Sequence, residues 1–138
     1  MGICEDIAAA RKCGKVRCGV TAGSVASVSD VAATFGLQPA AEHYREIDGV
    51  TARLVLVRLL GHDMAYDKGV VPTALADELA GHFLAQFGPG ARYFTNGDWQ
   101  LPDAQLRGWE AVAVATFDGG VLVLDARQSG CLWVEDED

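Results

Sequence analysis

The carboxyl-terminal stretch of the chain has the clearest strand pattern in the sequence, and it constrains the fold most. Valines and leucines at 121–124 favour one strand, and the run C-L-W-V at 131–134 favours a second. The polar segment between them, 126–130, is typical of a turn. We therefore predict a closing β-hairpin that ends in a run of four acids, residues 135–138.

A second hairpin is predicted in the middle of the chain. The dipeptide Asp48-Gly49 separates two β-rich runs within 43–60, and Asp-Gly between such runs is the strongest short signal of a tight hairpin turn. The second run, 52–60, is apolar on both faces apart from Arg53 and Arg58. That pattern favours a strand in the interior of a sheet.

Three segments favour helices. Apolar residues recur every four positions from Leu75 to Phe87, which predicts a helix over 73–87 that ends at Gly88-Pro89. A short helix is predicted over 3–12, and another over 30–35 with Ser27 or Ser29 as its cap.

Short strands are predicted at 15–20, 92–95 and 109–117, with loops at 61–71 and 98–108. Asp118-Gly119-Gly120 is interpreted as a turn or bulge. Together these elements predict a single α+β domain over residues 1–138, a mostly antiparallel sheet with two or three helices packed on it.

The charge balance argues against nucleic acid as a partner. The chain has 19 acids against 11 bases, a net charge of -8, so phosphates would be repelled. Such acidity fits either plain solubility or attraction to a basic protein. No run is long enough to span a membrane.

The four cysteines favour a cytoplasmic protein with reduced thiols. They lie at positions 4, 13, 18 and 131, without the C-x-x-C pair of a zinc knuckle. The amino end has no apolar core of a secretory signal. Cys131, between Gly130 and Leu132, is interpreted as a small buried apolar residue.

No motif specifies a catalytic residue, a cofactor or a metal. The three histidines lack metal-ligand spacing, and His43 is placed on a strand edge. The terminal acids lack the spaced oxygens of a calcium loop. The densest polar cluster in a loop is formed by His62, Asp63, Tyr66 and Asp67, so an alternative hypothesis is a small enzyme or ligand-binding domain that uses residues 62–67.

Residues 109–138 resemble the carboxyl end of small bacterial immunity proteins from contact-dependent and Rhs-type polymorphic toxin systems. The resemblance lies in T-F-D-x-G-V, at 116–118, 120 and 121, and in W-x-E-D-E-D, at 133 and 135–138. It implies a non-enzymatic cytoplasmic protein that binds one cognate toxin and occludes its active or essential surface. The acidity here agrees with a basic toxin.

Under this hypothesis the acidic tail, the 61–68 loop and the loop around Trp99 form the contact surface. At least two of the three tryptophans are expected in the core. A third hypothesis is an assembly subunit that forms a symmetric dimer; the sequence does not specify an oligomeric state. The residues predicted to contact the toxin are Asp63, Tyr66, Asp67, Trp99, Trp133, Glu135, Asp136, Glu137 and Asp138.

Overall fold

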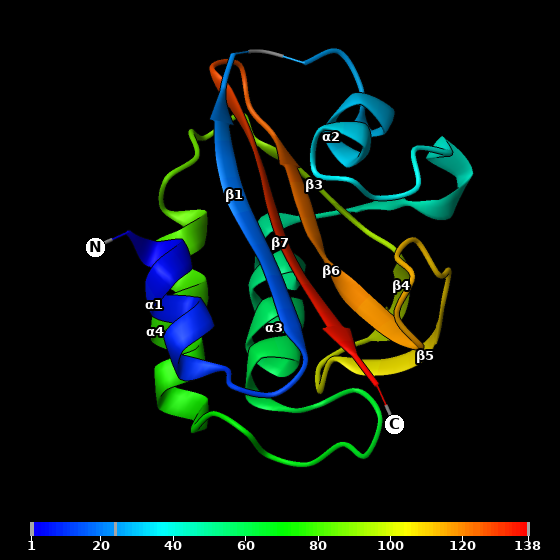
Figure 1. Cartoon of the computed structure of the whole chain (residues 1–138). Helices are drawn as coiled ribbons and strands as arrows, with labels where there is room; N and C mark the ends of the chain where they lie inside the picture. The colour runs from blue at the N-terminus through cyan, green and yellow to red at the C-terminus, as the bar shows by residue number, and fades with distance from the viewer. Residues whose placement is uncertain (1, 24, 138) are drawn as a thin grey trace.

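The computed structural model describes residues 2–23 and 25–137, and in this part of the chain it has an α+β fold. Five antiparallel strands form the main sheet in the order β1-β7-β6-β3-β2 (Figure 1). β4 and β5 form a separate two-stranded hairpin. The strands are β1 (Lys15–Ala22), β2 (Arg45–Ile47), β3 (Arg92–Thr95), β4 (Gly97–Gln100), β5 (Gln105–Trp109), β6 (Phe117–Leu124) and β7 (Gln128–Asp136).

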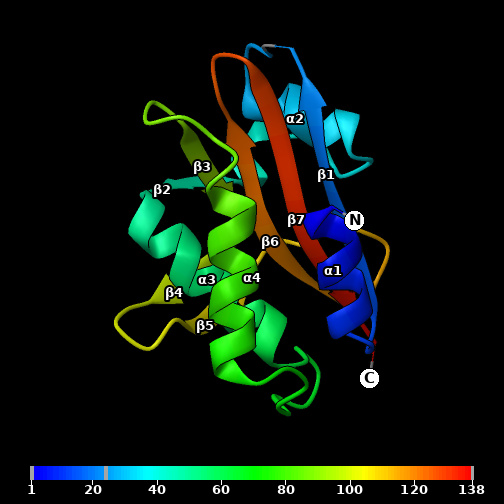
Figure 2. The same cartoon turned by 90° about the vertical axis from the view of Figure 1, so that its left-hand side faces the viewer.

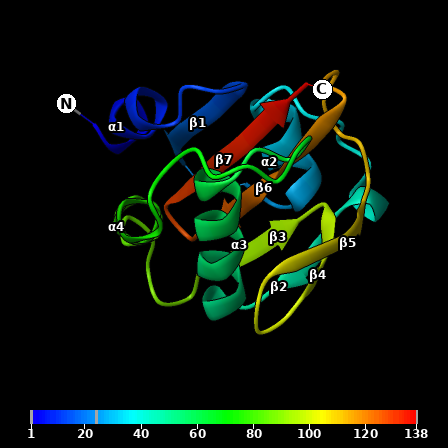
Figure 3. The same cartoon turned by 90° about the horizontal axis from the view of Figure 1, so that it is seen from below.

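Helices cover both faces of the main sheet. The helices are α1 (Ile3–Ala10), α2 (Val28–Thr34), α3 (Gly49–Gly61) and α4 (Thr73–Leu84), with a short 3-10 turn at Ala41–His43. Figure 2 shows α1, α3 and α4 on one face, with α2 on the other. Seen from below, α4 lies on one side of α3 and the β4–β5 hairpin on the other (Figure 3).

The predicted closing hairpin is confirmed and lies inside the main sheet, but its turn is shorter than the predicted 126–130, because β7 already begins at Gln128. β6 pairs with β7 from Phe117–Asp136 to Leu124–Ser129, and β7 also pairs with β1 from Lys15–Glu135 to Ala22–Gln128. Successive side chains of β7 point to opposite faces. Leu132 and Val134 therefore join the core under α1, α3 and α4, whereas Cys131 and Trp133 join the core under α2.

The predicted hairpin at Asp48-Gly49 is wrong, because Gly49 begins helix α3. The Asp48 side chain accepts a hydrogen bond from the Thr51 amide at 2.7 Å, which makes Asp48 a helix cap. Asp-Gly suits both a tight turn and a helix start. The apolar run shows helical spacing, since its buried residues are Ala52, Val55, Leu56, Leu59 and Leu60.

Three predictions for the second half are also wrong. Residues 98–108 form most of the β4–β5 hairpin, and most of 109–117 connects β5 to β6 outside any strand. Asp118-Gly119-Gly120 lies inside β6. A Cβ on Gly120 would come within 2.2 Å of the Leu132 carbonyl oxygen and 2.6 Å of the Trp133 ring. These glycines therefore allow close packing within the sheet.

Several other elements agree with prediction. α1, β1 and β3 lie where expected, and the Ser27 side chain caps α2 by accepting from the Asp30 amide. α4 begins at Thr73 and ends at Leu84, three residues early. His43 lies in the 3-10 turn, not on a strand edge.

The expectation of reduced thiols is wrong for two of the four cysteines. Cys4 and Cys18 form a disulfide that ties α1 to β1, while Cys13 and Cys131 are free. Burial raises the pKa of the Cys131 thiol, in agreement with its interpretation as an apolar core residue. Within residues 2–23 and 25–137, no helix is both long and apolar enough to cross a membrane.

Candidate functional site

The predicted docking edge at the carboxyl end is mostly buried, so this part of the predicted contact surface is wrong. Glu135 and Asp136 belong to strand β7, and both residues are buried. Glu135 pairs with Arg17 at 3.0 Å on one face of the sheet. Glu137 accepts hydrogen bonds from the amide and hydroxyl of Thr116, and Asp138 lies outside the described residues.

Asp136 forms a buried ion pair with Arg11. Its two carboxylate oxygens accept from the two terminal guanidinium nitrogens at 2.9 and 2.8 Å, and the Arg11 side chain is fully buried. The other three N–H groups of Arg11 donate to the carbonyl oxygens of Cys13, Leu59 and His62. All five donors are satisfied, which is the condition under which a buried guanidinium is tolerated.

Trp133 also has a structural role, since its side chain is 0% exposed. Its indole N–H donates to the buried Asp118 carboxylate at 3.0 Å, and Asn96 donates to the same carboxylate at 2.9 Å. The Val112 amide adds a third bond at 3.2 Å, which anchors the β5–β6 connection to the sheet. Burial raises the pKa of Asp118 despite these donors.

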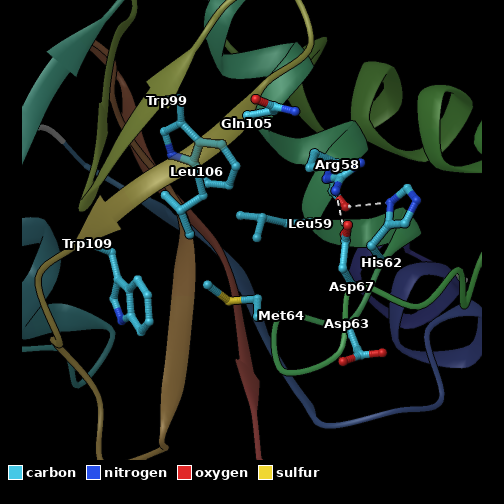
Figure 4. Close-up of a pocket in the computed structure, with 10 residues that line it drawn as sticks. All are labelled: Arg58, Leu59, His62, Asp63, Met64, Asp67, Trp99, Gln105, Leu106 and Trp109. Carbon is cyan, nitrogen blue, oxygen red and sulfur yellow. Dashed lines mark hydrogen bonds and ion pairs between the residues drawn. The ribbon is translucent and has the colours of Figure 1, made fainter.

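Three of the four residues predicted in the 62–67 loop, His62, Asp63 and Asp67, line a cavity of about 370 Å³ together with Trp99 (Figure 4). It opens between the end of α3, the following loop and the β4–β5 hairpin. In Figure 4 the indoles and Leu106 stand on one side, Arg58, His62 and Asp67 on the other, with Leu59 and Met64 between. The lining residues are Arg58, Leu59, His62, Asp63, Met64, Asp67, Trp99, Gln105, Leu106 and Trp109.

The loop side of this cavity is built by short-range hydrogen bonds. Asp63 accepts from the amides of Tyr66 and Lys68 at 2.6 and 3.2 Å, so both its oxygens hold the turn. Figure 4 shows its carboxylate directed away from the other lining side chains. Asp67 has a positive φ of 55° and pairs with Arg58. Tyr66 is 70% exposed beside the cavity and does not line it.

The hairpin side is aromatic. The Trp99 indole N–H donates to the Thr95 hydroxyl at 3.2 Å, which fixes the ring. Trp109 packs against Phe117 with ring centroids 5.5 Å apart and remains 37% exposed. Of the three tryptophans, Trp133 is fully buried and Trp99 is partly buried against the core, so the expectation that at least two pack in the core is confirmed.

Several polar side chains at this cavity bond to one another or to the backbone. The His62 ring nitrogen Nδ1 lies 3.4 Å from the Arg58 carbonyl oxygen, and among the described residues no serine, threonine, cysteine or lysine lines the cavity with it. Over the described residues, no three His, Cys, Asp or Glu side chains gather in a group that could hold a metal ion. The cavity offers aromatic faces, apolar surface and one ion pair.

Sequence reasoning found Asp63, Asp67 and Trp99, but it missed Trp109 and Arg58. Helical spacing was the available signal for Arg58, because residues 58 and 62 share one face of a helix. No local signal places Trp109 beside them.

Comparison with protein-family models, curated protein sequences and solved structures finds no match for this chain.

Proposed function

We propose that this protein is an immunity protein that binds a cognate bacterial toxin and occludes its active or essential surface. The observation that carries the proposal is that two tryptophans, the exposed Trp109 and the partly buried Trp99, meet a polar loop at one cavity. Tryptophan and tyrosine are enriched among the residues that dominate protein interfaces. The resemblance of residues 109–138 to immunity proteins gives the class of partner.

The contact surface in this proposal differs from the sequence-based one. It consists of Tyr66, Asp67, Trp99 and Trp109, with Asp63 holding the loop. Trp133, Glu135 and Asp136 are left out because they are buried. The net charge of -8 supports a basic partner, since opposite charge speeds diffusional encounter.

The proposal places the protein in the cytoplasm, where the immunity proteins that it resembles act. The Cys4–Cys18 disulfide argues for an oxidising compartment, because cytosolic thiols are kept reduced. Titration of free thiols in protein taken directly from the host cytoplasm distinguishes reduced cysteines from a retained disulfide. Four reactive thiols under denaturing conditions would fit the cytoplasm, whereas two would mean that the disulfide is retained.

The decisive experiment first sequences the genes beside the gene for this chain and then uses the toxin domain that the proposal expects one of them to encode. Calorimetric titration of that domain should give tight 1:1 binding, and the chain should inhibit its activity. Trp109→Ala should weaken binding by about 30-fold or more, the loss expected for a central interface aromatic. The control is Val50→Ala, which truncates another exposed apolar side chain at the start of α3, at the opposite end of the helix from the cavity. Absence of any binding would refute the proposal.

A second candidate is a ligand-binding domain that uses the 62–67 loop. It is favoured by the cavity volume of about 370 Å³, which is within the range of small-molecule sites. Thermal-shift screening against a panel of metabolites tests it. A concentration-dependent rise in melting temperature that Trp99→Leu abolishes would favour this candidate over the first.

A further inference from the structure

We propose that the cavity receives an arginine side chain presented by the protein partner. This inference rests on the proposed function and names the chemical group that the site recognises. Four features carry it: two fixed indole faces, an exposed carboxylate, an apolar base and a rigid support.

The two indoles form a surface suited to a planar cation. Trp99 is held by its bond to Thr95, and Trp109 by its packing on Phe117. Both line the same cavity. An aromatic face carries negative potential, and guanidinium stacks on it better than an ammonium group does. Because both rings are already held by neighbours, little side-chain entropy is lost when a guanidinium stacks there.

The charges that line the cavity favour a cation over an anion. Asp67 and Arg58 form an ion pair at the cavity, whereas the Asp63 carboxylate is directed away from it and holds the turn. The Arg58 group already binds Asp67 Oδ1, and the Asp67 side chain is 67% exposed. Its second oxygen can therefore accept from an incoming guanidinium. An anion would instead compete with Asp67 for Arg58 and lie against indole faces, which repel it.

The base of the cavity suits the aliphatic stem of an arginine. Leu59, Met64 and Leu106 supply apolar surface between the two walls (Figure 4). Long basic side chains bury their methylene groups on such surface while the charged head reaches polar partners. An arginine side chain can therefore contact all three parts of the cavity, with its stem on the apolar base and its guanidinium on the aromatic wall and the carboxylate.

The buried ion pair under the cavity keeps this arrangement rigid. Arg11 donates to the carbonyl oxygens of Leu59 and His62, and Asp136 accepts from the Met64 amide at 2.8 Å. Three lining residues are therefore tied to one buried pair. A site held in its binding geometry before contact loses less entropy on binding.

The test is a titration of the whole protein with Nα-acetyl-arginine N-methylamide, followed by NMR of the indole N–H signals. The Trp99 and Trp109 signals should shift in a saturable way, with a dissociation constant on the order of millimolar. The Trp133 signal should stay in place, because its indole is buried against Asp118. The matched neutral probe, the citrulline analogue, has the same shape without the charge and should bind at least about 3-fold more weakly.

Two variants and a control complete the test. Trp109→Leu should weaken arginine binding by about 3- to 30-fold, the range of a cation–π contact, and Asp67→Asn by about 2- to 5-fold. The control is Asp77→Asn, because Asp77 is likewise exposed and paired with an arginine but lies outside the cavity. The unchanged Trp133 signal shows that each variant is folded.

Equal binding of the arginine and citrulline probes, absence of saturable shifts, or equal losses in Asp67→Asn and Asp77→Asn would overturn the inference. None of these measurements uses the toxin. A chain that binds its toxin but not the arginine probe would therefore refute this inference and leave the proposed function standing. A chain that binds the probe but no toxin would refute the proposed function instead.

Discussion

Replacing Asp136 by asparagine should destabilise the protein strongly, although the residue is two positions from the end of the chain. The carboxylate is buried, accepts two bonds from Arg11 and a third from the Met64 amide. Asparagine removes the negative charge and replaces one carboxylate oxygen, an acceptor, by an NH₂ group, a donor. Because both oxygens of Asp136 accept from N–H groups, that NH₂ group would face another donor. The Arg11 guanidinium stays buried without its counter-ion.

The magnitude follows from the burial of the pair. Breaking a fully buried ion pair by removing one partner costs about 3–5 kcal/mol. For a chain of 138 residues, the entropy of unfolding near 60 °C is about 0.29 kcal/mol/K, so the melting temperature should fall by about 10–17 °C. That loss is a large part of the total stability of an ordinary domain.

The assay is urea unfolding followed by far-UV circular dichroism, with Glu137→Gln as the control. Glu137 is the next acid along the chain, but it is exposed and bonded only to Thr116. Its substitution should cost less than about 1 kcal/mol. Arg11→Met should cost less in the Asp136→Asn background than alone, because both changes break the same network. Equal small losses for Asp136→Asn and Glu137→Gln would refute the buried-pair account.

Three further predictions concern stability. Gly120→Ala should unfold the protein or lower its free energy of unfolding in urea by at least about 3 kcal/mol, because the added carbon would overlap the backbone of the neighbouring strand. A variant with near wild-type stability would contradict that packing. Cys4→Ser/Cys18→Ser should lower the free energy of unfolding by about 3 kcal/mol under non-reducing conditions, since the bridge closes a short loop, whereas Cys13→Ser should not. Burial raises the pKa of Asp118 in the folded protein above its ordinary value of 3.8. The stability that comes from protonated Asp118 is therefore lost as the pH rises from that ordinary value through the raised pKa of the folded state. The unfolding free energy of the wild type minus that of Asp118→Asn, measured in urea from acid to neutral pH, should therefore fall over this interval, and a flat or rising difference would refute the assignment.

Prediction from sequence worked where short-range chemistry decides the structure. The closing hairpin, the α4 helix and the Ser27 cap of α2 all depend on residues within a few positions of each other. Where one short signal has two meanings, prediction failed. Asp48-Gly49 suited a turn, and only the helical spacing of the buried residues that follow distinguishes the α3 helix from a strand.

The candidate site was predictable only in part for the same reason. Its loop side, Asp63 to Asp67, is continuous in the chain and held by its own hydrogen bonds. Its aromatic side comes from the β4–β5 hairpin, which prediction treated as a loop and the start of a strand. Trp109 reaches the cavity because that hairpin lies beside α3, a relation that no short pattern encodes (Figure 3).

The amino-acid sequence by itself determined the α+β class, the closing hairpin and the acidic charge of the chain. Only the tertiary structure decided what the terminal acids do. In the sequence, residues 135–138 form a charged run that would be solvated in an isolated segment. In the fold, Asp136 meets Arg11 from 125 positions away and Glu135 meets Arg17 from 118. Burial of a carboxylate is tolerated only when such a partner is brought to it, and that partner comes from the other end of the chain.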